Sequence, residues 1–205
     1  SYDNMCGETW RATQLIQMAR SLQPDLITDN RLEGGGGYQG SLLSAQPSFF
    51  SGDFACPEQI IPPQGIVDAL GRPVAWEACV TMNENWGYCA HDLNYKPAPL
   101  LVRKLVECVS KGGNLLLNVG PDARGNFPEQ SVQILEQIGR WMRKNSASIY
   151  GCGNAQLPKP EWGWLTKKGN TIYAHILERS IGPIAIPPLG GRIKSMRLVR
   201  DGSEI

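Results

Sequence analysis

The sequence VSKGGNLLLNVGP, residues 109–121, indicates the fold class of this 205-residue chain. Its centre, residues 114–119, is a mostly apolar run, which is typical of a parallel strand covered on both faces. The two glycines before this run follow an amphipathic helix expected over residues 97–110, because glycine commonly ends a helix. A helix that leads directly into a buried strand predicts an α/β fold.

The segments on either side of this stretch continue the alternation of helices and strands. Toward the N-terminus we expect a helix over residues 8–22, a short buried strand over residues 25–30 and a strand over residues 74–82. Residues 38–73 hold several prolines and few periodic segments, which indicates a long loop of the kind that usually carries function. Toward the C-terminus, a first-turn proline precedes a helix expected over residues 129–144.

The pattern changes to short β segments near residue 150. Residues 171–177 alternate apolar and polar side chains with period two, and residues 184–186 and 193–199 are further short strands. We therefore expect a domain boundary near residues 151–160, between an α/β part and an all-β part.

Composition and charge exclude several classes of protein. The chain has 20 Lys+Arg against 19 Asp+Glu, so it lacks the basic excess of a nucleic-acid-binding domain. It contains no run of 18 apolar residues, so no membrane-spanning helix is expected. With only His91 and His175, a histidine-rich metal site is disfavoured. The six cysteines show no C-x-x-C spacing, and we expect mostly free, buried thiols, with disulfides as the alternative.

Carboxylates, amides, an arginine and tryptophans gather at the expected strand ends and in the long loop. In parallel α/β folds, functional side chains project from the carboxyl ends of strands. Glycoside hydrolysis needs one carboxylic acid that protonates the leaving oxygen and a second carboxylate that attacks or stabilises the sugar carbon. The alternative is that these carboxylates are paired or solvated. The candidate residues are Asp29, Asn30, Arg31, Asp53, Glu58, Trp76, Glu77, Asn83, Asn85, Trp86 and Asn118.

The order and spacing of several motifs resemble the α-L-fucosidases of glycoside hydrolase family 29 over most of residues 1–152. Residues 109–121 are the most specific of them. The others are LQPD at 22–25, DNR at 29–31, GDF at 52–54, PEQ at 57–59, WEAC at 76–79, TMN at 81–83, WGY at 86–88 and IYG at 149–151.

The resemblance implies a fold and an activity. Residues 1–152 would be the C-terminal part of a catalytic (β/α) barrel of the TIM type, and residues 153–205 the beginning of a β-sandwich. The implied reaction is retaining hydrolysis of α-L-fucosides through a covalent fucosyl–enzyme intermediate, without a metal or an organic cofactor. The implied partners are a fucosylated oligosaccharide or glycoconjugate, together with the missing N-terminal part of the barrel or another copy of the chain.

The resemblance also implies roles for single residues. Residues 1–4 resemble the continuation of the nucleophile segment, so we expect the nucleophilic aspartate about two residues before Ser1. Asp3 is then expected to be a loop residue, with nucleophile as its alternative role. Glu58 resembles the acid/base position of several bacterial relatives and is favoured. Glu77 is the alternative acid/base, or a supporting carboxylate.

Two further residues are expected to contact the sugar. Arg31 resembles the arginine that binds fucose, and its alternative is a structural pair with Asp29 or Asp53. Trp86 resembles an aromatic position that packs on the C5-methyl side of fucose, and its alternative is a core position. Asn118 is expected to be a structural amide. The alternatives for the whole chain are a non-catalytic or degenerate carbohydrate-binding relative, and a barrel glycosidase for another deoxy-sugar.

Overall fold

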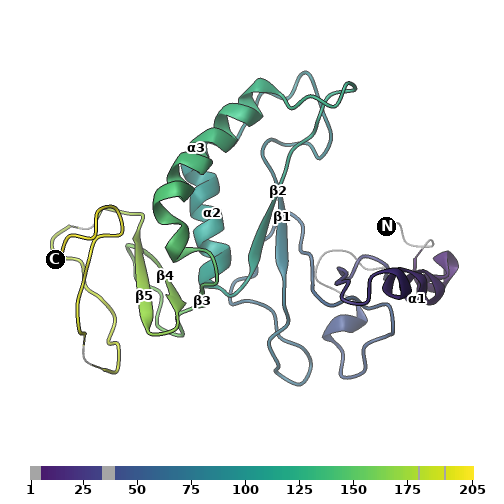
Figure 1. Ribbon diagram of the computed structural model, residues 1–205, viewed down its shortest axis with the longest axis horizontal. Helices are drawn as coiled ribbons and strands as arrows, with labels where there is room; N and C mark the ends of the chain where they lie inside the picture. Colours follow the sequence, from purple (N-terminus) through teal and green to yellow (C-terminus); the bar gives the residue numbers. More distant parts are fainter. Residues whose placement is uncertain (1–5, 34–39, 180, 192) are drawn as a thin grey trace. The chain divides into compact units, whose positions relative to one another are not determined.

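The computed structural model describes residues 6–33, 40–179, 181–191 and 193–205, and its ribbon is drawn in Figure 1. The chain has an α/β fold and forms two compact units. The first runs as far as Val80 and includes Gly113–Leu116, and the second comprises Thr81–Gly112 and Leu117–Ile205.

The first unit is built around short parallel backbone pairings. Three isolated parallel bridges join Asp29 to Phe54, Ala55 to Trp76 and Glu58 to Cys79. Strands β1 and β2 are hydrogen-bonded neighbours in the sheet. The elements of this part of the chain are η1 (Gly7–Trp10), α1 (Ala12–Leu22), η2 (Ser41–Leu43), β1 (Glu77–Thr81) and β2 (Asn114–Asn118).

Two expectations for these strands need correction. Residues 25–30 form no continuous buried strand, because Asp29 alone makes a bridge there and Ile27 is 69% exposed. The strand expected to be covered on both faces is β2, yet its Leu116 is 45% exposed. The described polypeptide covers one face of this sheet more fully than the other.

The better-covered face is made of small and apolar side chains. Ala55 and Ala78 are fully buried and Val80 is 7% exposed. Trp76 is also buried, and its indole lies against Gly113 at the start of β2. Because side chains alternate along a strand, the residues between these positions project to the opposite face.

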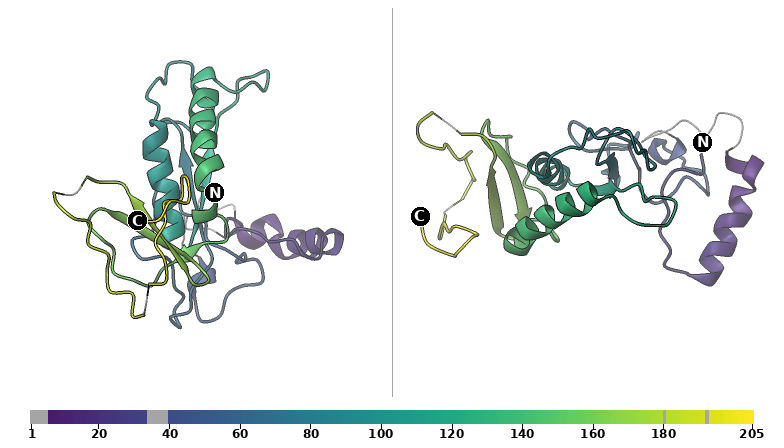
Figure 2. Two further views of the ribbon diagram at one scale, coloured as in Figure 1. Left: turned by 60° about the vertical axis from the view of Figure 1, so that its left-hand side comes forward. Right: turned by 90° about the horizontal axis from the view of Figure 1, so that it is seen from above.

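The second unit packs helices α2 and α3 against each other, side by side in Figures 1 and 2. Leu101 and Ile134 join the two helices in one buried cluster, and Val106 belongs to a second cluster that also includes Trp164. The small antiparallel sheet therefore lies against α2. The elements of this unit are α2 (Ala98–Ser110), α3 (Glu129–Asn145), η3 (Ser146–Ser148), β3 (Gly153–Asn154), β4 (Gly163–Lys168) and β5 (Thr171–Ile176).

Two of the short strands expected near the C-terminus are absent from the described residues. Residues 184–186 are not in a strand; Pro183, Pro187 and Pro188 flank them and cannot donate ladder hydrogen bonds. Residues 193–199 contribute only an antiparallel bridge from Arg197 to Glu204. The period-two segment after residue 170 does form a strand, β5, paired with β4.

All six cysteines lie in the described part of the chain and are free thiols, as expected, although only Cys56 and Cys108 are buried. Among the described helices, none has the length and apolar character needed to cross a membrane.

Candidate active site

Period-two alternation brings two glutamates to one face of the first unit. The pairings of Ala55 with Trp76 and of Glu58 with Cys79 fix a single register between the segment ending at Glu58 and β1. Glu58 and Glu77 both lie on the face opposite the buried alanines, and the thiols of Cys56 and Cys79 lie on it with them. Glu77 is half-buried and the Glu58 side chain is 47% exposed.

Arg31 joins this group through its guanidinium. Its Nη1 lies 2.6 Å from Glu58 Oε1, and its Nη2 donates a hydrogen bond of 2.7 Å to the Cys56 carbonyl oxygen. The Arg31 backbone N–H donates to Asp29 Oδ1 at 3.1 Å, so Asp29 contacts the backbone of Arg31 while Glu58 pairs with its side chain. A planar guanidinium with several donors can hold a carboxylate and still offer N–H groups to a ligand.

Hydrogen bonds to Asn30 and Asp53 fix the backbone beneath this pair. The Cys56 N–H donates to Asn30 Oδ1 at 3.0 Å, and Asn30 is 4% exposed. Asp53 does not pair with Arg31. Its carboxylate accepts two hydrogen bonds from Arg20, at 3.0 and 3.1 Å, and one from the Thr28 N–H at 2.8 Å. Asp53 therefore ties the segment before Arg31 to helix α1.

Gly52 allows these two segments to approach each other closely. Its φ is +87°, and a Cβ at this position would lie 2.3 Å from the Asp29 carbonyl oxygen. The GDF motif thus combines a glycine that permits the close approach with an aspartate that fixes it.

The two glutamates differ in depth and in electrostatics. In the parallel register, Glu77 is level with Cys56 and Glu58 is level with Cys79, so Glu58 lies closer to the carboxyl ends of the strands. Burial raises the pKa of the Glu77 carboxyl, and the negative charge of Asp29 raises it further. Glu77 has the raised pKa that suits a general acid. Glu58 instead lies nearer the carboxyl ends of the strands and pairs with Arg31.

The two thiols on this face are not activated nucleophiles. Burial is the main cause that raises the pKa of both Cys56 and Cys79. A thiol with a raised pKa stays protonated at neutral pH and behaves as a small, weakly polar side chain. These cysteines were not predicted as site residues from the sequence, although both share the period-two position of their neighbouring glutamates. That spacing was the signal that could have found them.

Trp86 belongs to the second unit, and its side chain is 41% exposed there rather than part of a core. Asn118 has the structural role expected of it, because its Nδ2 donates a hydrogen bond of 2.7 Å to the Trp86 carbonyl oxygen. Asp3 and the glycines at 34–37 lie outside the described residues. Within the described ranges, no cluster of three or more His, Cys, Asp or Glu side chains could hold a metal ion.

Two carboxylates and an arginine on one face, near the carboxyl ends of parallel segments, are typical of the glycoside hydrolase class of site. The family model described as alpha-L-fucosidase matches residues 2–147. This chain belongs to the α-L-fucosidase family.

Individual relatives agree with this assignment. An α-L-fucosidase of Dictyostelium discoideum is 37% identical over 108 residues, which are 50% of this chain and 23% of that protein. The solved structure of α-L-fucosidase isoenzyme 1 from Paenibacillus thiaminolyticus is 55% identical with a TM-score of 0.92, over 100% of this chain and 47% of that one. A family 29 α-L-fucosidase from Bacteroides thetaiotaomicron is 25% identical with a TM-score of 0.77, over 95% and 45% of the two chains. The chain therefore spans less than half of these relatives.

Proposed function

We propose that the protein containing this chain is a retaining α-L-fucosidase that hydrolyses terminal α-L-fucosyl linkages of oligosaccharides or glycoconjugates. The observation that carries the proposal is the Arg31–Glu58 ion pair beside Glu77, on one face of the parallel segments, in a chain of the α-L-fucosidase family. The substrate would be a fucosylated oligosaccharide or glycoconjugate, and no cofactor is needed for the reaction.

The reaction has two displacement steps. The acid/base group donates a proton in the first step and accepts one in the second. In the first, an aspartate carboxylate attacks C1 of fucose while the acid/base carboxyl gives its proton to the departing glycosidic oxygen. In the second, the same group takes a proton from water as the water oxygen attacks C1 and releases the aspartate. The nucleophile is a carboxylate outside the described residues.

Glu58 is the proposed acid/base, with Glu77 as the alternative. Glu58 lies nearer the carboxyl ends of the strands and has a half-exposed carboxyl, so it can reach the leaving group of a bound glycan. Arg31 is proposed to hold Glu58 in place and to contact hydroxyl oxygens of fucose. Glu77 would then be a supporting carboxylate beside the sugar, with a pKa raised by burial and by the charge of Asp29. Trp86 is proposed to pack on the C5-methyl side of fucose.

We also propose the finer fold. The successive parallel pairings from Asp29 to Cys79, and the β1–β2 neighbours joined through α2, support part of a (β/α) barrel over residues 1–152. The β3–β4–β5 sheet supports the beginning of a β-sandwich over residues 153–205. The remaining barrel strands would come from other polypeptide, either more of the same protein or another copy.

The proposal is tested with Glu58→Gln and Glu77→Gln variants of the full-length protein. Losing the acid/base slows cleavage of unactivated glycans by about 10²–10⁴-fold, and an aryl fucoside with a good leaving group is affected less. Azide, which needs no general base, should restore turnover of the aryl fucoside and give a fucosyl azide of retained configuration. We expect this pattern for Glu58→Gln alone.

If azide instead rescues Glu77→Gln alone, Glu77 is the acid/base. If the wild-type full-length protein hydrolyses no α-L-fucoside, the proposed function is wrong and the chain belongs to a non-catalytic relative.

A further inference from the structure

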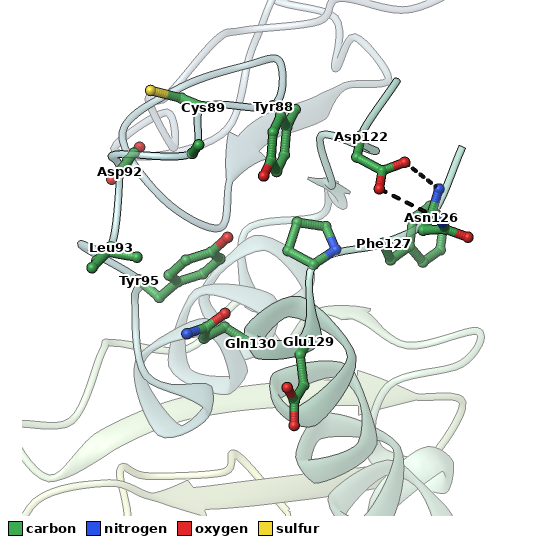
Figure 3. Close-up of a pocket in the computed structure, with 12 residues that line it drawn as sticks. Tyr88, Cys89, Asp92, Leu93, Tyr95, Asp122, Asn126, Phe127, Glu129 and Gln130 are labelled. Carbon is green, nitrogen blue, oxygen red and sulfur yellow. Dashed lines mark hydrogen bonds between the residues drawn. The ribbon is translucent and has the colours of Figure 1, made fainter. Parts of the chain in front are cut away.

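Two loops of the second unit enclose an open pocket with a cavity volume of about 220 Å³ (Figure 3). One loop follows β1, and the other follows β2 and leads into α3. In open or closed α/β folds, ligands bind outside the carboxyl ends of strands, which is where such loops begin. The pocket lining includes Tyr88, Asp92, Tyr95, Asp122, Glu129 and Gln130.

Each loop is held by an aspartate that bonds within its own loop. The Asp92 carboxylate accepts hydrogen bonds from the Asn85 side-chain amide at 2.7 Å and from the Glu84 backbone N–H at 2.9 Å. The Asp122 carboxylate accepts from the backbone N–H groups of Arg124 and Asn126, at 2.8 and 2.9 Å. Both carboxylates are therefore occupied in fixing the walls, and a fixed wall loses little entropy on binding a ligand.

The loop that carries Tyr88 is also attached to the end of β2. Asn118 donates to the Trp86 carbonyl oxygen, and Gly120 lies against the backbone of Gly87 and Tyr88. A Cβ on Gly120 would lie 2.6 Å from the Gly87 carbonyl carbon. The position of Tyr88 is thus set by the strand end.

Two tyrosine hydroxyls and one side-chain amide line the opening. Tyr88 is 54% exposed, and Figure 3 shows its hydroxyl and that of Tyr95 directed into the space between the loops. The Tyr95 ring packs against the core cluster of Met82 and Ala98, and this packing fixes the position of its hydroxyl. Within the described part of the chain, neither these hydroxyls nor the Gln130 amide has a hydrogen-bond partner.

We propose that this pocket binds one neutral saccharide unit of the glycan, with the Tyr88 ring against the apolar face of the sugar. The hydroxyl of Tyr95 and the amide of Gln130 would bond its hydroxyl groups. The cavity is smaller than the roughly 300–1,000 Å³ of a drug-sized site, which suits a single ring. The lining includes Asp92, Asp122 and Glu129 and no lysine or arginine, which disfavours an anion. The choice of a sugar as the ligand rests on the proposed function.

The test is an NMR titration of the full-length protein with lactose, a neutral disaccharide that contains no fucose. We expect saturable binding in the wild type. Tyr88→Ala should weaken it by about tenfold or more, because the stacking surface is lost, whereas Tyr88→Phe should stay within about threefold. Tyr150→Ala, which removes another exposed tyrosine of the same unit outside the pocket, is the matched control and should bind like the wild type.

Absence of saturable lactose binding in the wild type, or equal weakening by Tyr88→Ala and Tyr150→Ala, would overturn the proposal. Hydrolysis of an aryl α-L-fucoside by the wild type reports separately on the proposed function. If the enzyme is active but does not bind lactose, only the pocket proposal is wrong. If the protein is inactive but binds lactose through Tyr88, the pocket proposal stands and the proposed function is wrong.

Discussion

Gly113 shows at the scale of one residue how the sequence builds the sheet that carries the site. A Cβ on Gly113 would lie 2.2–2.4 Å from three atoms of the Trp76 indole, which is 2% exposed. Gly113→Ala should therefore destabilise the protein by about 1–3 kcal/mol, as overpacking of a filled core does. The measurement is the unfolding midpoint of the full-length protein.

The matched control is Gly153→Ala, because nothing lies within 4 Å of the Cβ it would add. Its midpoint should stay close to that of the wild type. Equal midpoints for Gly113→Ala and Gly153→Ala would show that the contact with Trp76 does not constrain residue 113.

Single site residues were predictable to different degrees. The motif that contains Arg31 and the motif that contains Glu58 identified both residues, and the structure brings them into an ion pair. Their pairing was not predictable, because Asp29 and Asp53 were equally available partners in the sequence. Asp53 contacts Arg20 on α1 instead, a choice that depends on three-dimensional packing.

At the scale of elements, the pair of strands β4 and β5 contains a buried histidine that makes the stability of the fold depend on pH. His175 is 8% exposed, and its Nε2 lies 3.1 Å from the Thr166 hydroxyl oxygen. Burial lowers the pKa of His175 from 6.5 to about 4. Between these two pH values the unfolded chain binds the proton and the folded chain does not, so stability is lost as pH falls from 6.5 toward 4.

The expected loss attributable to His175 reaches roughly 3 kcal/mol at the acid end of this window. His175→Gln should have a shallower pH dependence of stability across the window. Direct NMR titration of the His175 ring supplies a second readout. An apparent pKa near 6.5 in the folded protein would contradict the prediction.

Helices were easier to predict than strands. The helix expected over residues 129–144 is observed as Glu129–Asn145, because its periodic pattern and the proline at its N-cap are local signals. Residues 25–30 and 184–186 were predicted as strands from short apolar runs. Strand pairing also needs a neighbour in register, which the local sequence does not reveal.

At the scale of the whole molecule, the sequence predicted the α/β class and the family, and both are confirmed. Its division at residue 152 stays a prediction, whereas the compact units separate near Val80. A boundary read from the sequence follows a change in local pattern. Compact units depend on long-range packing, such as Trp164 of β4 against the Val106 cluster of α2.

The most direct measurement of the central claim is the anomer that the full-length protein releases first from an aryl α-L-fucoside, followed by proton NMR before mutarotation. The Arg31–Glu58–Glu77 site, acting with an aspartate nucleophile, predicts that α-L-fucose appears first, because two displacements at C1 restore the original configuration. Initial release of β-L-fucose would contradict the retaining mechanism, and absence of hydrolysis would contradict the proposed activity itself.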